Sequence, residues 1–134
     1  MHDVLREFGP LPESLSARYG AQILRGLQYI HEMDVIHRDL KSANVLVMKS
    51  GNVKLADFGV SVDLQRQRPA SLDVAGTPRW MAPEIIEMKG ASTKSDIWSL
   101  GCTVVEMLTA LPPFSETRFN AQGDVPRTFQ RHLR

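Results

Sequence analysis

A polar segment in the first half of the chain carries three groups that could do chemistry. The stretch HRDLKSAN offers the carboxylate of Asp39, the ammonium group of Lys41 and the amide of Asn44 at fixed spacing. A loop with these groups can equally be structural, so this segment alone leaves both interpretations open. Two triplets follow it, Asp-Phe-Gly at 57–59 and Ala-Pro-Glu at 82–84. Each triplet is a weak signal alone, but the three motifs in this order and spacing are very specific.

Together the motifs resemble the signatures of the eukaryotic protein kinase family. The resemblance implies an α+β fold, namely the mostly helical C-terminal lobe of a protein-kinase-like domain with a small β-hairpin. This partial domain is expected to span residues 1–114, followed by a basic and poorly ordered tail at 115–134. The N-terminal lobe is expected to be absent, because the chain has no Gly-rich loop, strand lysine or partner glutamate ahead of the motifs. The chain is therefore expected to be a fragment.

The resemblance implies roles in phosphoryl transfer, which depends on positioning and on charge neutralisation. Asp39 would accept or orient the proton of the substrate hydroxyl, and Lys41 would neutralise charge on the γ-phosphate. Asn44 and Asp57 would hold Mg²⁺ through oxygen ligands. Leu46 would form the floor of the adenine pocket. The expected cofactors are therefore ATP and Mg²⁺.

Other residues acquire supporting roles from the same resemblance. His37 and Phe58 would stack as part of an apolar spine. Asp96 would accept hydrogen bonds from the backbone of the catalytic loop, although an ordinary acid near the start of a helix would give the same sequence. Trp98 and Cys102 are expected in the core, and no basic neighbour of Cys102 in the sequence argues for a thiolate.

The residues around the motifs indicate the class of substrate. Lys41, two residues after Asp39, and the run Gly76-Thr77-Pro78 are typical of serine/threonine kinases, in which Thr77 would hydrogen-bond both side chains. The segments GTPRWMAPEII and SDIWSLGCTVVEMLT resemble the sterile group, which includes MAP kinase kinase kinases and septation-initiation kinases. The expected function is transfer of the ATP γ-phosphate to Ser or Thr hydroxyls of protein substrates. The alternative is a catalytically inactive truncated kinase that acts as a protein-interaction fragment.

A signalling role implies partners and an activation segment. Protein substrates and the upstream and downstream kinases of a cascade are the expected partners. Arg38 would pair with a phosphate on the activation segment. Many relatives have a phosphorylatable threonine four residues before Thr77, where this chain has Asp73. Its carboxylate could supply part of that charge, and a solvated loop acid is an equal alternative. Ser71 and Ser61 are candidate phosphosites.

Composition narrows the class of protein. The 134 residues suit one domain, and a net charge of +1 lacks the basic excess of nucleic-acid-binding proteins. No run of about 18 apolar residues is present, so no membrane span is expected. The single cysteine permits no intrachain disulfide and fits a reducing compartment. The expected location is the cytoplasm, with the nucleus as the alternative.

Two long helices are predicted to position these motifs. Apolar residues recur every three or four positions from Pro12 to about Asp34, which predicts an α-helix. Gly20 and Gly26 lie inside it, and they either mark close packing or are tolerated. The second helix is predicted from about Ser95 to Thr109; it is apolar on nearly all sides, as a core helix would be. The residues predicted to share its inner face are Ile97, Leu100, Val104 and Leu108.

Short strands are predicted between the helices. Residues 45–48 and 53–56 read as two strands joined by turn residues, so they predict a hairpin that brings Asp39 close to Asp57. Val35-Ile36 is a shorter β-like run. A long polar connection is predicted at 59–79, and a short helix at 83–88.

Overall fold

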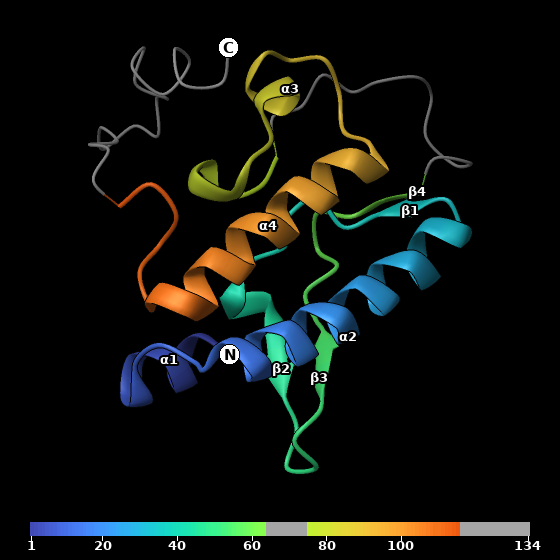
Figure 1. Cartoon of the computed structure of the whole chain (residues 1–134). Helices are drawn as coiled ribbons and strands as arrows, with labels where there is room; N and C mark the ends of the chain where they lie inside the picture. The colour runs from blue at the N-terminus through green and yellow to red at the C-terminus, as the bar shows by residue number, and fades with distance from the viewer. Residues whose placement is uncertain (64–74, 116–134) are drawn as a thin grey trace.

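The computed structural model describes residues 1–63 and 75–115 of the chain (Figure 1). Its longest elements, α2 and α4, pack against each other, and the β2–β3 hairpin also packs against α2. Two antiparallel two-stranded sheets are present in these ranges. In chain order the elements are α1 (His2–Phe8), α2 (Glu13–Glu32), β1 (Val35–Ile36), the 3₁₀ helix η1 (Ser42–Asn44), β2 (Val45–Val47), β3 (Val53–Leu55), β4 (Val62–Asp63), the 3₁₀ helix η2 (Pro78–Trp80), α3 (Pro83–Ile86) and α4 (Thr93–Thr109).

The predicted first helix is confirmed as α2. Its buried residues follow the helical period and face the core, because side chains three or four apart share one side of a helix. Pro12 precedes the first turn, and Glu13 places a negative charge at the positive end of the helix dipole. The buried stripe of α2 is Ser16, Tyr19, Ile23, Leu27 and Ile30.

Of the two glycines inside α2, only Gly26 marks close packing. A Cβ atom at Gly26 would lie 3.1 Å from the side chain of Leu55, so α2 approaches β3 closely at this point. A Cβ atom at Gly20 would lie 3.5 Å from the side chain of Val104 on α4, which is an ordinary van der Waals contact. The absence of a side chain therefore matters at Gly26, where α2 packs on the hairpin, and glycine is tolerated at position 20.

The predicted hairpin is confirmed, and a second strand pair was not predicted. Val45 pairs with Leu55 in the antiparallel β2–β3 register. The unpredicted strand β4 lies inside the connection expected at 59–79. It pairs with β1, which precedes the hairpin in the chain. Two residues carry too short a pattern to identify a strand from sequence. Of the predicted connection, residues 64–74 lie outside the described ranges.

The predicted inner face of α4 is wrong at Ile97 and Leu108, whereas Val104 packs against the core. Ile97 and Leu108 are 46% and 40% exposed, and only Leu100 of the predicted face is buried. Ser99 and Thr103 are buried because their hydroxyls bond to helix carbonyls one turn earlier. The buried stripe is Ser95, Asp96, Ser99, Leu100, Cys102, Thr103, Glu106 and Met107. A stripe that is mostly polar can face inward here because its polar groups find partners.

Helix α1 was not predicted, because its seven residues contain a single buried residue, Leu5, and show no clear period. The short predicted helix at 83–88 is confirmed over Pro83–Ile86. No helix among the described residues is long and apolar enough to cross a membrane. The predicted tail at 115–134 lies, apart from Ser115, outside the described ranges.

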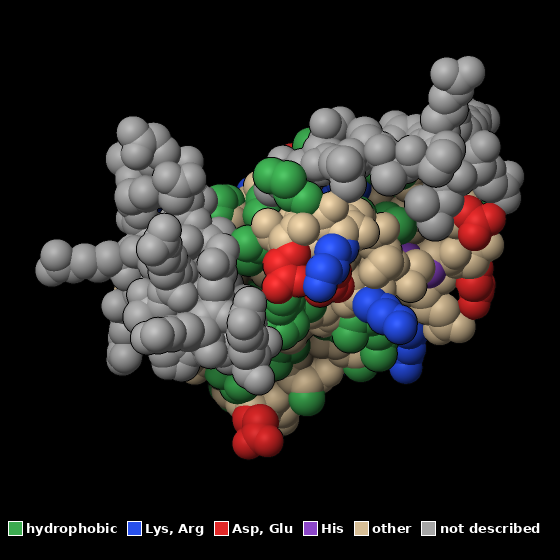
Figure 2. Space-filling model, turned by 90° about the horizontal axis from the view of Figure 1, so that it is seen from above, with side chains coloured by type: hydrophobic (Ala, Val, Ile, Leu, Met, Phe, Trp, Pro, Cys, Tyr) green, Lys and Arg blue, Asp and Glu red, His purple; other side chains and the backbone are tan. Residues whose placement is uncertain are grey.

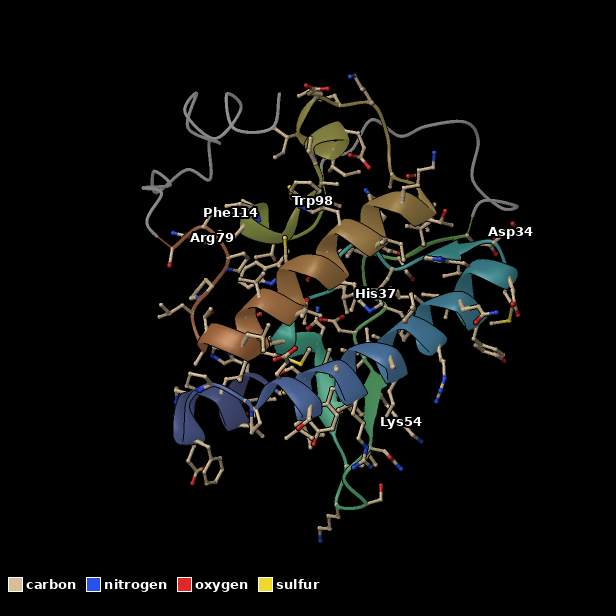
Figure 3. The ribbon with its side chains drawn as sticks, viewed as in Figure 1. Asp34, His37, Lys54, Arg79, Trp98 and Phe114 are labelled. Carbon is tan, nitrogen blue, oxygen red and sulfur yellow. The ribbon has the colours of Figure 1, made fainter. Side chains whose placement is uncertain are left out.

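Two hydrophobic clusters hold these elements together. The larger one joins α1, α2, the hairpin and α4, and it includes the fully buried Leu27, Leu40 and Met107. The smaller cluster contains Met81 and Ile85 and packs against Trp98, whose side chain points from α4 toward α3 (Figure 3). Cys102 is buried on α4 as predicted. The face in Figure 2 mixes acidic, basic and hydrophobic side chains, in keeping with the small net charge.

Candidate active site

The candidate site forms where the loop after β1 meets the segment that enters η2. Leu40 is completely buried, so it anchors the loop in the larger core cluster. The side chains on either side of it are only partly buried: Asp39 is 14% exposed and Lys41 is 23% exposed. The loop therefore presents a carboxylate and an ammonium group at the surface from a fixed apolar point.

Asp39 lies at the centre of a closed hydrogen-bonded cluster. Its Oδ2 lies 2.9 Å from the Nζ of Lys41 and accepts a hydrogen bond of 3.0 Å from the amide of Asn44. Its Oδ1 accepts a hydrogen bond of 2.6 Å from the hydroxyl of Thr77. The same hydroxyl accepts a hydrogen bond of 2.6 Å from Lys41. The structure thus brings together four predicted site residues from two segments that are more than thirty positions apart.

The hairpin places Asp57 beside this cluster. The amide N–H of Ala56 donates to the carbonyl of Asn44 (2.9 Å), so the residue that follows Ala56 continues next to the loop. Asp57 has a φ of 61°, which turns its exposed carboxylate out of the strand direction. Its Oδ1 accepts a hydrogen bond from the backbone N–H of Gly59 (3.2 Å). The pairing of β2 with β3 thus brings the residue before Asp57 into contact with the segment that bears Asp39 and Asn44.

The oxygen atoms of Asn44 and Asp57 fit a divalent cation of the Mg²⁺ type. Asn44 donates through its amide nitrogen to the carbonyl and carboxylate of Asp39, which directs its Oδ1 away from these partners. Mg²⁺ prefers hard oxygen ligands and usually combines one or two protein groups with phosphate oxygens and water. No group of three or more His, Cys, Asp or Glu residues within residues 1–63 and 75–115 could hold a metal ion. The oxygen atoms of Asn44 and Asp57 match the one or two protein groups that such a cation takes.

His37 is completely buried between α2 and α4 (Figure 3). Its ring contacts that of Phe58, with centroids 5.0 Å apart and planes inclined by 54°, so the predicted ring contact is present. The Nε2 of His37 donates to the carbonyl of Ala56 (3.1 Å), and its Nδ1 accepts from the backbone of Asp39 (3.4 Å). Both ring nitrogens are therefore used by the backbone, and the ring has a positioning role.

Asp96 supports the loop from the first turn of α4. Its buried carboxylate accepts hydrogen bonds from the backbone N–H groups of His37 and Arg38, both at 2.9 Å, as predicted. It also accepts one from the Nε2 of His31 at 2.7 Å, which the sequence analysis missed. His31 lies in the last turn of α2, so one carboxylate joins both long helices to the loop.

Gly76 lets the second segment come close to the loop. It has a φ of 123°, and a Cβ atom here would lie 2.6 Å from the backbone carbonyl oxygen of Arg38. No side chain fits at that distance, so glycine is required for this approach. Thr77 follows directly, which is why its hydroxyl reaches Asp39. The sequence analysis noted Gly76 within a motif but missed this contact.

Of the remaining predicted site residues, the structure describes Leu46 and Arg38 but not Ser71 and Asp73. Leu46 lies on β2 with 51% of its surface exposed, so it is available to a ligand or to another protein surface. Arg38 has a φ of 70° and is partly buried. Ser71 and Asp73 lie outside the described residues, and the predictions about them stay predictions.

Burial raises the pKa of the Cys102 thiol to about 11, so this thiol is protonated at neutral pH.

The segment after α4 is held against η2. The guanidinium group of Arg79 donates to the carbonyl of Phe114 (2.7 Å) and to that of Pro113 (3.3 Å), and Figure 3 shows Arg79 and Phe114 side by side.

A further residue missed by the sequence analysis is Glu106, a buried acid of α4 that contacts both the loop and η2. No pattern in the sequence around Glu106 distinguishes it from an exposed helix acid.

Comparisons with known proteins agree with the motifs. The family model of the protein kinase domain matches residues 1–131. The chain is 59% identical over 108 residues to MAP3K epsilon protein kinase 1 of Arabidopsis thaliana, which covers 81% of this chain and 8% of that protein. It is 54% identical over 114 residues to cytokinesis protein sepH of Aspergillus niger, covering 85% of this chain and 8% of that protein. It is 51% identical to cell division control protein 7 of Schizosaccharomyces pombe, covering 85% and 10%. The chain thus spans about a tenth or less of each relative's length.

Proposed function

Because this chain belongs to the protein kinase domain family, we propose that it carries the catalytic loop of a serine/threonine protein kinase. The reaction moves the γ-phosphoryl group of ATP to a Ser or Thr hydroxyl of a protein and releases ADP. The observation that carries this proposal is the closed cluster of Asp39, Lys41 and Thr77, with Asn44 bonded to the same carboxylate. Phosphoryl transfer requires this kind of fixed arrangement of charges more than it requires covalent help from the protein.

Each residue of the cluster has a role that follows from its chemistry. The Asp39 carboxylate is a partly exposed acceptor that can orient the substrate hydroxyl and take its proton as the new P–O bond forms. The Lys41 ammonium group lies 2.9 Å from that carboxylate and can offset negative charge on the phosphoryl oxygens. Thr77 bonds to both groups and holds them at a fixed separation.

Members of this family generally use ATP and Mg²⁺. We propose that Asn44 and Asp57 hold the cation here, since their oxygen atoms suit a hard metal ion and lie on neighbouring segments. When bound, Mg²⁺ would neutralise part of the phosphate charge. The Asp39 carboxylate directs Asn44 by accepting the hydrogen bond of its amide nitrogen, so the base and the metal ligand are positioned together.

We assign the described helices and hairpin to the C-terminal lobe of the domain, with Leu46 under the adenine ring. The exposure of Leu46 and of Phe58, at 51% and 44%, supports an apolar surface that a ligand or another part of the domain covers. The same exposure favours a second candidate function, a non-catalytic protein-interaction fragment, because exposed apolar patches promote association. Calorimetry of the full-length protein with ATP and Mg²⁺ separates the two, since only the kinase proposal requires binding; the 134-residue chain alone is expected to bind ATP weakly, because the surface over the adenine ring is not encoded in it.

The similarity to a MAP3K epsilon protein kinase and to a cytokinesis protein supports a place in a protein kinase cascade. We propose upstream and downstream kinases of such a cascade as partners, acting in the cytoplasm or the nucleus. Arg38 would face a phosphate of the activation segment, and Asp73 and Ser71 are the candidates to supply negative charge there.

The test is Asp39→Asn in the full-length protein, assayed with ATP and a generic protein substrate. The substitution keeps the size of the side chain but removes the base, so kcat should fall by about 10²–10⁴-fold with little change in ATP binding. Asp3→Asn on the exposed face of α1 is the matched control and should leave kcat unchanged. Near-normal turnover of Asp39→Asn would refute the assignment, and a product dominated by phosphotyrosine would refute the substrate class.

A further inference from the structure

The residue that follows the two prolines after α4 has an unusual backbone conformation. Phe114 comes directly after Pro112 and Pro113 and has a φ of 55°, in the left-handed region. A bulky residue rarely adopts this conformation, and it persists only where the surroundings hold it in place. The side chain of Phe114 is nevertheless 39% exposed, so packing of the ring into the core does not account for the conformation. Phe114 is therefore held through its backbone.

Arg79 is the side chain that holds this backbone. Its Nη1 donates to the carbonyl of Phe114 (2.7 Å) and to that of Pro113 (3.3 Å). The torsion angles of Phe114 set the angle between these two carbonyl groups, and its left-handed φ turns both toward one nitrogen. Hydrogen bonds from a guanidinium group are charge-assisted and stronger than those between neutral groups. Arg79 therefore fixes the position of Phe114 and the direction in which its ring leaves the backbone.

The same arginine places Phe114 near the reacting groups. Arg79 lies in η2, two residues after Thr77, so the Cα atoms of these two residues are at most about 7.6 Å apart. The hydroxyl of Thr77 donates to Asp39 at 2.6 Å, and one arginine side chain covers the distance from η2 to Phe114 (Figure 3). An extended peptide advances about 3.3 Å per residue. Phe114 is thus within reach of side chains a few residues away from a hydroxyl that is bound at Asp39.

An exposed aromatic ring at this place suits an apolar side chain of the substrate. A Leu, Ile or Met side chain that packs on the ring removes apolar surface of both groups from water. The Nη1 of Arg79 is directed at the backbone carbonyls of residues 113 and 114, which leaves the ring of Phe114 as the apolar group exposed here. The position therefore favours an apolar substrate residue over a charged one.

We propose that Phe114, held by Arg79, is a specificity-determining residue that selects protein substrates with an apolar side chain within a few residues of the acceptor Ser or Thr. This proposal rests on the proposed kinase function and narrows its substrate class. Contact between a peptide and Phe114 does not require phosphate transfer. Binding and turnover can therefore be tested separately.

The test uses the full-length protein and a library of peptides that share one acceptor Ser and differ in the residues around it. Phosphate transfer from ATP should be enriched for Leu, Ile and Met at one or two of the flanking positions. The strongest position defines a pair of peptides, with Leu or Ala there, and the measured quantity is the ratio of their kcat/KM values. Phe114→Ala should lower this ratio about tenfold, as expected for the loss of one buried apolar contact.

Two further variants and a control separate selectivity from folding. Phe114→Leu keeps an apolar side chain and should retain most of the ratio, whereas Arg79→Gln should lower it because the ring loses its anchor. Phe8→Ala is the control, since Phe8 is another exposed phenylalanine, on α1, and it should leave the ratio unchanged. Melting temperatures show which variants are folded.

A binding measurement makes the test independent of turnover. The same two peptides are made with Ala in place of the acceptor Ser, and their binding to the full-length protein is followed by fluorescence anisotropy. The Leu peptide should bind the unaltered protein about tenfold more tightly than the Ala peptide, and this difference should disappear in Phe114→Ala.

Three results would overturn the proposal. The first is an unaltered protein with no preference for apolar residues near the acceptor, and the second is an unchanged ratio in a folded Phe114→Ala variant. The third is a preference for acidic residues that Arg79→Gln abolishes, which would assign the contact to the guanidinium group. If the unaltered protein transfers no phosphate, the proposed kinase function fails. The peptide pair is then chosen from the library by binding, and its anisotropy still decides whether Phe114 contacts an apolar residue.

Discussion

The closest backbone approach in the site makes Gly76→Ala a sharp perturbation. A Cβ atom at this position would lie 2.6 Å from the carbonyl oxygen of Arg38, and side chains essentially never approach closer than 3.0 Å. Neither atom belongs to a flexible side chain, so the segment before η2 must move away from the loop. Because Thr77 is the next residue, its hydroxyl is expected to move away from Asp39.

The size of the effect has two parts. An L-residue at a φ of 123° is strained, at about 1–3 kcal/mol. Moving the backbone by at least 0.4 Å, from 2.6 to 3.0 Å, lengthens the hydrogen bonds that Thr77 makes to Asp39 and from Lys41, both now 2.6 Å. A hydrogen bond to a charged group contributes about 1.5–3 kcal/mol, so its loss lowers kcat by about 10–100-fold if the bond acts in the transition state.

Gly90→Ala is the matched control for this prediction. Gly90 also has a positive φ, 91°, but a Cβ atom there would meet nothing within 4 Å. It therefore shares the backbone strain without the clash. Thermal denaturation should show a loss of stability in both variants, larger in Gly76→Ala, whereas turnover on a protein substrate should fall only in Gly76→Ala. Equal turnover in the two variants would refute the reasoning that this close approach positions Thr77.

Three further predictions concern the supporting helices. Asp96→Ala should lower the free energy of unfolding by about 3 kcal/mol or more, because it leaves buried backbone donors of the loop unpaired; a change below 1 kcal/mol in urea denaturation would contradict this. Burial raises the pKa of Cys102 to about 11, so iodoacetamide at pH 8 should modify the folded chain slowly and the denatured chain quickly. Since the unfolded thiol loses its proton from about pH 8.5, the Cys102 contribution to stability should fall as the pH rises from there toward 11. Gly101→Ala, at an exposed position of α4 with open space around it, should stabilise the chain by about 0.5–1 kcal/mol, and a lower melting temperature would count against it.

Local patterns were enough to predict the elements that lie close together in the chain. The period of Tyr19, Ile23 and Leu27 predicted α2, because a helix places such residues on one buried side. Turn residues between two β-branched runs predicted the β2–β3 hairpin. The motif residues Asp39 and Asn44 could likewise be identified from their spacing, since they belong to a single loop.

The tertiary structure decided which polar groups face inward. The spacing of the apolar residues assigned Ile97 to the inner face of α4, yet the side chain of Ile97 is 46% exposed. Asp96 and Glu106 are buried instead, because donors from the loop bearing His37 and Ser42 meet their carboxylates. These partners lie about sixty positions earlier in the chain. A hydrophobic pattern records only the polarity of each residue, whereas burial of a polar group depends on a partner that only the folded chain supplies.

The contacts that complete the site are of the same long-range kind. Gly76 and Thr77 reach the loop only because the chain returns to it after β4, and Gly76 provides the space for that return. Residue types and spacing therefore determined which groups this protein can use for chemistry. The distances between Asp39, Lys41 and Thr77 were decided by packing between segments that are far apart in sequence, because such packing depends on the shape of the whole core.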